Sequence, residues 1–191
     1  MNMNMTQDQA IEVIRQYTEL FNLNSEQEVI DATQLLMANP DNVYEGPMYR
    51  TVYLPYDVVS KFKTVDQLNQ YLIDNARDVS SWSKSIDGMT NAVYHLIDGE
   101  CIEHNGGIVI CRTGQALDCE KVYEHCWHDG PEEELLCNSR VQDFTIHAFT
   151  LGCDQMSHAI DQYDRFLMDL VQLELDDEEQ AYTAYVKNIT G

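Results

Sequence analysis

The feature that most limits the fold of this chain is a change in the spacing of its apolar residues near Asn39-Pro40-Asp41. Before this point the apolar residues recur at helical spacing. After it, short segments rich in β-branched and aromatic residues predict strands, and beyond Met156 the helical spacing returns. Because helices and strands are grouped rather than alternating, the sequence predicts an α+β fold. A length of 191 residues suits a single domain.

Three pairs of residues predict where helices begin. In each pair a Ser or Thr precedes a Gln or Glu at the spacing of a capping box, so that side chains satisfy unpaired backbone amides of the first turn. The pairs are Thr6 with Gln9, Ser25 with Glu28, and Thr64 with Gln67. The first two predict an N-terminal helical lobe, and the third predicts a helix over residues 64–72.

Short strands are expected between these helices and the C-terminal part of the chain. They are residues 48–54, 79–83, 107–111, 135–137 and 144–149, and residues 85–96 suit a further helix. The first strand should stop at Pro55, because proline cannot donate a ladder hydrogen bond. We therefore expect one domain with an N-terminal helical lobe (1–45), a strand core (46–150) and C-terminal helices (151–191).

Charge sets the chain apart from an average globular protein. Eleven Lys and Arg residues against 33 Asp and Glu residues give a formal net charge of −22. Such a surface repels phosphate backbones and anionic membranes and favours basic partners. Residues 1–8 lack the basic start and apolar run of a signal peptide, and no stretch is apolar enough to span a bilayer. We expect a cytoplasmic protein whose six cysteines are reduced thiols.

Three segments place polar or charged residues where strands are expected. They are, in order, Tyr49-Arg50-Thr51, Ser81-Trp82-Ser83 and Glu132-Glu133-Glu134. In the first an arginine interrupts an apolar strand, and in the second two serines flank a tryptophan. In the third, two glutamates spaced by one residue run directly into an apolar strand. Each segment alone is common, but their order and strand context make the combination more specific.

This ordered triple resembles the motifs of the arginine–serine–glutamate mono-ADP-ribosyltransferases. That family has an arginine at the end of its first strand, a Ser-X-Ser or Ser-X-Thr strand, and a Glu-X-Glu segment before an apolar strand. The resemblance covers residues 49–149 and implies an ADP-ribosyltransferase-like core of short strands, with an N-terminal helical lobe and a C-terminal helical extension. The small size and the lack of a secretion signal are most similar to the bacteriophage-encoded enzymes, which modify host proteins.

The resemblance implies catalytic roles in a reaction that uses NAD as a substrate and releases nicotinamide. Glu134 would hydrogen-bond the ribose and stabilise an oxocarbenium-like transition state. Glu132 would orient the arginine of a target protein and draw off its proton, and Ser81 would brace Glu134. Glu133 would point away from the site, because neighbours in an extended segment alternate between faces.

The same resemblance implies a set of residues that bind NAD. Arg50 would hold the diphosphate, which suits a bidentate guanidinium. The backbone at Thr51, where the family often has glycine, would hold the nicotinamide amide. Ser81, Trp82 and Ser83 would complete the pocket. The expected partner is a host protein, whose surface would be basic to suit the charge of this chain.

Other interpretations stay open beside this one. On the same fold, an NAD glycohydrolase would give the ADP-ribose to water, and an inert acidic protein could instead occupy a basic surface as an inhibitor. No metal is expected, because the cluster of Cys119, His125, Cys126 and His128 lacks the paired spacing of zinc ligands. No local pattern singles out a cysteine nucleophile. The segment Asn105-Gly106-Gly107 predicts a hairpin-like turn rather than a phosphate-binding loop.

Overall fold

A computed structural model describes residues 5–19, 25–89, 105–123, 133–150 and 178–190 of the chain. The elements are α1 (Gln7–Glu19), α2 (Glu26–Met37), the 3₁₀ turn η1 (Pro40–Asn42), β1 (Val43–Pro55), α3 (Tyr56–Val59), α4 (Val65–Asp74), β2 (Ser80–Ser83), β3 (Asn105–Asp118), α6 (Cys119–Val122), β4 (Glu134–Cys137), β5 (Thr145–Thr150) and α8 (Glu178–Thr190). This order of helices and strands confirms the α+β prediction.

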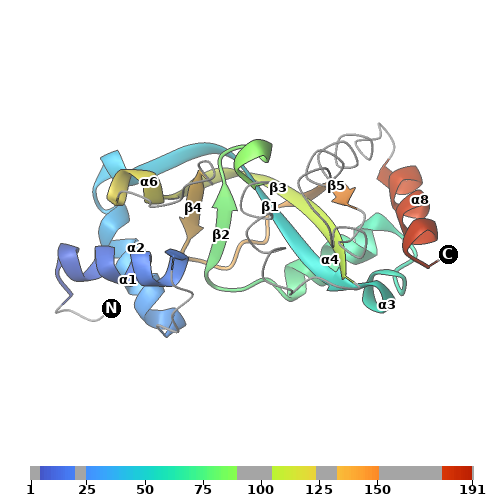
Figure 1. The fold of residues 1–191 in the computed structure, drawn as a ribbon, viewed down its shortest axis with the longest axis horizontal. Helices are drawn as coiled ribbons and strands as arrows, with labels where there is room; N and C mark the ends of the chain where they lie inside the picture. Colours follow the sequence, from blue (N-terminus) through green and yellow to red (C-terminus); the bar gives the residue numbers. More distant parts are fainter. Residues whose placement is uncertain (1–4, 20–24, 90–104, 124–132, 151–177, 191) are drawn as a thin grey trace, which may run out of the picture.

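The strands form a small antiparallel barrel. Their order is β1-β2-β4-β3-β5, and β1 also pairs with β3, so the first four strands close a ring to which β5 is added. The long strands β1 and β3 pair from Val43 opposite Leu117 to Pro55 opposite Asn105, and they run along the molecule in Figure 1. By contrast, β1 meets β2 only where Tyr49 lies opposite Ser83. The ring is therefore weakly joined between β1 and β2.

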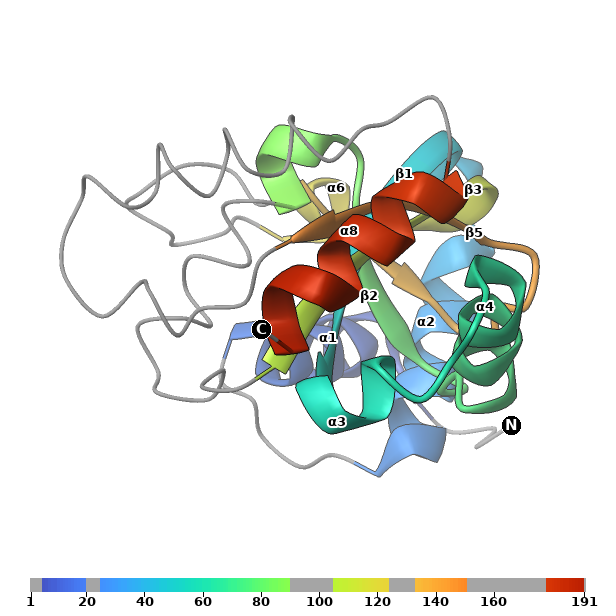
Figure 2. The same cartoon turned by 90° about the vertical axis from the view of Figure 1, so that its right-hand side faces the viewer.

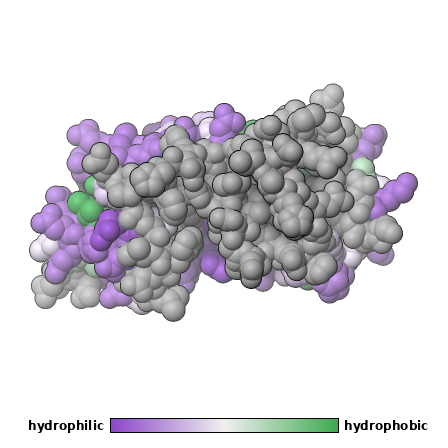
Figure 3. Space-filling model, viewed as in Figure 1, coloured by the Kyte–Doolittle hydropathy of each residue, from purple (hydrophilic) through white to green (hydrophobic). Residues whose placement is uncertain are grey.

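The N-terminal helices cover one end of this barrel. Ser25 and Glu28 form the predicted capping box at the start of α2, and Thr6 and Gln9 exchange the equivalent hydrogen bonds before α1. Apolar residues of both helices pack against the strands, in a cluster that includes Ala10, Ile14, Val29, Leu36, Leu117 and Leu136. In the view of Figure 3, the described residues over this lobe expose mainly hydrophilic side chains, as the acidic composition predicts.

The helices α3, α4 and α8 lie at the other end of the barrel (Figure 1). The predicted cap of α4 is present, because the Gln67 amide donates to the Thr64 hydroxyl. Figure 2 shows α8 lying across this end, next to α3 and β5. Its Tyr185 is fully buried and stacks on Phe149 of β5. The helical C-terminus predicted from the sequence thus includes one helix that belongs to the core.

Alternation along β2 and β4 gives each strand two distinct faces. Ser83 lies opposite Glu134, and Ser81 lies opposite Leu136. Because side chains alternate, one face carries Ser81, Ser83, Glu134 and Leu136, whereas the other carries Ser80, Trp82, Leu135 and Cys137. Cys137 donates a thiol contact to Met48 on β1, a strand to which β4 is not paired. The second face is therefore the interior of the barrel.

Some predicted boundaries differ from the structure. β1 begins at Val43, inside the segment expected to belong to the helical lobe, because η1 turns the chain directly into the strand. The predicted turn at Asn105-Gly106-Gly107 is wrong, since these residues pair with β1 as the start of β3. The helix expected beyond Met156 lies outside the described residues. Among those the structure describes, no helix is both long and apolar enough to cross a membrane.

Candidate functional site

A hydrogen bond joins the serine and glutamate motifs. The Ser81 hydroxyl donates to the Glu134 carboxylate at 2.6 Å, across the paired strands β2 and β4. Glu134 is the first residue of β4 and is 7% exposed, so its carboxylate is largely withdrawn from water. A buried carboxylate costs free energy unless it is hydrogen-bonded. Here the neighbouring strand supplies a donor, and the structure thus brings two of the predicted catalytic residues together.

The residue before this carboxylate has an unusual backbone. Glu133 has a φ of 52°, in the left-handed region that side chains other than glycine rarely adopt. Its carboxylate accepts a hydrogen bond from the Ser85 hydroxyl, and its carbonyl accepts one from the Lys84 amide at 3.2 Å. The extended backbone assumed for Glu133 is therefore wrong, so alternation does not set the direction of its side chain. Glu132 lies outside the described residues.

A lysine links the chain after β2 to the end of β3. The Lys84 ammonium pairs with Asp118 at 2.9 Å and with Glu120 at 2.6 Å. Desolvation lowers the pKa of Lys84, but the hydrogen bonds to these two carboxylates outweigh it and raise the pKa overall. Next to them, burial and the charge of Glu134 raise the pKa of the Cys119 thiol well above its usual range. Cys119 is consequently a neutral core thiol rather than a nucleophile.

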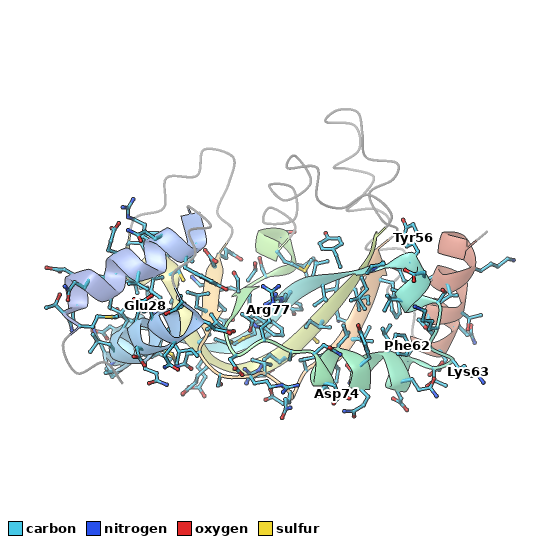
Figure 4. The ribbon with its side chains drawn as sticks, turned by 90° about the horizontal axis from the view of Figure 1, so that it is seen from below. Glu28, Tyr56, Phe62, Lys63, Asp74 and Arg77 are labelled. Carbon is cyan, nitrogen blue, oxygen red and sulfur yellow. The ribbon has the colours of Figure 1, made fainter. Side chains whose placement is uncertain are left out.

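A cavity of about 340 Å³ opens on the other side of β2. Its lining includes Arg50 of β1, Trp82 of β2, and Arg77 from the segment between α4 and β2. In Figure 4, Arg77 lies between the N-terminal helices and α4. By the alternation of β1, Arg50 faces the barrel interior together with Met48, not the face that carries Glu134. The arginine motif thus lies beside the serine motif but on the opposite face.

Tyr17 of α1 lies within electrostatic range of both faces. Burial raises the pKa of its phenol, the charges of Arg50 and Arg77 act against that rise, and the charge of Glu134 adds to it. Charges from both faces of β2 therefore act on Tyr17.

The remaining predicted binding residues are mostly buried. Trp82 is 3% exposed, donates its indole N–H to the Ser80 hydroxyl at 2.8 Å, and lies 6.4 Å from the Phe144 ring between centroids. Ser83 is 4% exposed on the face of Glu134. The Thr51 hydroxyl donates to the Met89 sulfur at 3.1 Å. Trp82 is therefore packed into the barrel interior.

Sequence reasoning missed Arg77. It precedes the serine strand by a few residues, in a loop where an exposed arginine has no distinctive pattern. A usable signal was the scarcity of basic residues, because only eleven occur in the whole chain and this one adjoins a motif.

Metal ligands and disulfides add nothing to this site. Within the described ranges, no group of three or more His, Cys, Asp or Glu side chains could hold a metal ion. The cysteines described there, Cys111, Cys119 and Cys137, are free thiols. Three members of the Cys119–His128 cluster lie outside these ranges.

Comparison of the chain with protein-family models, with curated proteins and with solved structures finds no match. Function must therefore be inferred from the chemistry of the site and from the motifs.

Proposed function

We propose that this protein is an NAD-dependent mono-ADP-ribosyltransferase that transfers ADP-ribose to an arginine of a target protein and releases nicotinamide. The observation that carries the proposal is the 2.6 Å hydrogen bond between Ser81 and the buried Glu134. It joins two motifs that lie far apart in sequence, in the arrangement the resemblance implies. The strand core would then be the catalytic core of this fold, flanked by its helical lobe and helical extension.

The chemistry requires a fixed negative charge near the ribose. As the bond between C1′ and the nicotinamide nitrogen breaks, its electron pair neutralises the pyridinium, and positive charge develops on the ribose. No general acid is needed, because the leaving group departs as neutral nicotinamide. A preorganised carboxylate stabilises that developing charge without reorganisation. Glu134 meets this requirement, since its surroundings exclude water and Ser81 holds one of its oxygens.

The acceptor must approach the opposite side of C1′. An arginine guanidinium is protonated at all ordinary pH values and becomes a nucleophile only when a neighbouring base removes a proton. Glu132 is the proposed base: its carboxylate takes the proton as the guanidine nitrogen forms the new bond to C1′. Its place in the Glu-X-Glu segment, two residues before Glu134, is what supports this role.

Arg50 is proposed to bind the NAD diphosphate, with Thr51 and Trp82 in the lining of the same cavity and Ser83 on the face of Glu134. Support comes from its position in the lining of the cavity beside β2. The single bridge between β1 and β2 leaves their edges unpaired next to Arg50 and Ser81. A ligand that lies across this opening could contact the arginine on one side and Glu134 on the other. We further propose that the protein acts in the cytoplasm on a basic host protein.

A second candidate is a non-enzymatic acidic protein that occupies a basic surface. The net charge of −22 favours it, because opposite charges steer association. An NAD glycohydrolase would use the same Glu134 with water as the acceptor. Both candidates make predictions about NAD that differ from those of the transferase.

One experiment distinguishes the transferase, the glycohydrolase and the acidic binding protein. The protein is mixed with NAD labelled in its adenylate part, with cell lysate and with agmatine, and the products are resolved by gel and chromatography. The transferase yields labelled protein bands and ADP-ribosyl-agmatine. Free ADP-ribose alone indicates the glycohydrolase, and unchanged NAD indicates the acidic binding protein and overturns the proposal.

A further inference from the structure

Two arginines line the cavity beside β2 without a partner of opposite charge. Arg50 and Arg77 make no hydrogen bond or ion pair within the part of the chain that the structure describes. This is unexpected in a chain with 33 acidic and eleven basic residues, where an arginine has many carboxylates to choose from. Lys84, Arg112 and Arg15 each have such a partner. What sets Arg50 and Arg77 apart is that both lie in the lining of one cavity.

The two charges also act on each other. Burial lowers the pKa of Arg50, and the positive charge of Arg77 acts in the same direction. Two like charges therefore line one cavity, Arg50 partly buried and Arg77 exposed. An anion placed between them would remove the repulsion and supply the missing hydrogen-bond acceptors. The site is thus arranged for a ligand with concentrated negative charge.

The rest of the lining is largely apolar and aromatic. Tyr71, Trp82 and Phe144 contribute rings, and Asn75 contributes a polar group near Arg77. The cavity volume of about 340 Å³ lies at the lower end of the range typical of small-molecule sites. Trp82 and Phe144 are only 3% and 4% exposed, whereas the partly exposed ring of Tyr71 provides a surface on which a planar base can pack. An isolated inorganic anion would leave this ring unused.

We propose that this cavity binds a nucleoside diphosphate group, with its phosphates between Arg50 and Arg77 and its base against the ring of Tyr71. The new assignment is Arg77, which becomes the second phosphate-binding cation. The site lies on the face of β2 that carries Trp82, opposite the Ser81–Glu134 pair. The proposal shares Arg50 with the proposed transferase but goes beyond it, because it concerns how a ligand's charge is held and does not depend on any bond being broken.

Calorimetric titration of the full chain with ADP, inorganic pyrophosphate and adenosine tests the site. Wild type should bind ADP most tightly, pyrophosphate more weakly and adenosine weakest, and ADP affinity should fall as salt is raised. Arg77→Gln should weaken ADP binding by about tenfold or more, since a charge-assisted contact is lost. Arg77→Lys should weaken ADP binding less, because it keeps the positive charge. Arg77 is exposed, so neither change should unfold the protein, and circular dichroism verifies this.

Arg15→Gln is the matched control, because it removes the same charge from a helix-surface arginine that is paired with Glu12. It should leave ADP affinity unchanged. The proposal is overturned if wild type binds neither ADP nor pyrophosphate, or if Arg77→Gln and Arg15→Gln have equal effects. ADP binding that depends on Arg77 without any NAD turnover would refute the transferase and keep this site. NAD turnover that is unchanged in Arg77→Gln would support the transferase and refute the phosphate-binding role of Arg77.

Discussion

The two faces of β2 differ in how their charged groups are satisfied. One face carries the Ser81–Glu134 hydrogen bond, in which a carboxylate is satisfied by a donor from the adjacent strand. The other face carries Trp82 and looks onto a cavity in which Arg50 and Arg77 lack anionic partners. The Glu134 carboxylate thus has a hydrogen-bond donor without any ligand, whereas the two arginines have no anion among the described residues to balance their charge.

This difference separates two tasks that a transferase must perform. A group that stabilises a transition state should be fixed before the substrate arrives, because reorganisation during the reaction costs free energy. A group that binds substrate gains most when its charge is unpaired beforehand, because no internal ion pair has to be broken. Because side chains alternate along β2, a strand of four residues, a fixed carboxylate and unpaired arginines lie close together on its two sides. The following changes test whether the two faces are independent.

The largest change in stability is expected for Trp82, the buried residue of β2 on the cavity face. Trp82→Ala should lower the free energy of unfolding by about 3–5 kcal/mol, since a large buried ring is lost and the cavity is enlarged. Urea denaturation of the two proteins measures the difference. Ser81→Ala, on the other face of the same strand, should cost only about 1–3 kcal/mol. Equal losses would show that Trp82 is not part of the packed interior.

Glu134→Gln should lower NAD turnover by about 100-fold or more, the loss typical when a preorganised electrostatic group is removed. Glutamine retains the shape and can still accept the hydrogen bond from Ser81, so the fold should persist. ADP affinity should remain that of wild type, because Glu134 lies away from the cavity face. Turnover near the wild-type level would refute the assignment of Glu134. A parallel loss of ADP affinity would show that the two faces act as one site.

Glu132→Gln should lower transfer to agmatine by about 100-fold, because an amide cannot remove the proton of a guanidinium. Hydrolysis of NAD should be largely retained, since water needs less help from a base and Glu134 is intact. Chromatography of one reaction separates ADP-ribosyl-agmatine from free ADP-ribose. If transfer and hydrolysis fall together, Glu132 instead shares the role of Glu134.

The smallest change in stability and activity is expected for Ser85, whose hydroxyl binds Glu133 just before β4. Ser85→Ala removes the hydroxyl that binds Glu133 and accepts the Gly88 amide, so stability should fall by about 1 kcal/mol. Transfer to agmatine should fall several-fold more than hydrolysis, because Ser85 holds Glu133, the sequence neighbour of the proposed base Glu132. Ser85→Thr keeps the hydroxyl and should restore the ratio of the two activities. An unchanged ratio in Ser85→Ala would assign Ser85 a structural role alone.

Local patterns in the sequence correctly predicted where helices begin and where strands lie. The caps at Thr6, Ser25 and Thr64 depend on neighbouring residues, and each begins a helix as expected. The strand positions followed from β-branched and aromatic runs. The proximity of Ser81 and Glu134 was predicted only through the family resemblance, because nothing local indicates which strands pair.

Other features depend on contacts that no local pattern reveals. Closure of the barrel by β1 and β3 joins residues far apart in sequence, and the glycines at the start of β3 suggested a turn instead. The left-handed backbone of Glu133 was not expected, because glutamate has no preference for it and its partner Ser85 comes from a distant segment. Arg77 joins the site only because the loop after α4 brings it beside β1.

Closure of the barrel also affects how the protein is made. Ser81 and Glu134 are separated by 53 positions, and β2 obtains most of its pairing from β4. While a nascent chain has passed residue 83 but not Cys137, β2 has neither its main partner strand nor its carboxylate. Non-local pairing of this kind forms late, after the intervening loop has closed. Under the proposed function, incomplete chains released before Cys137 would therefore be inert toward NAD, and only chains that extend beyond β4 would be active.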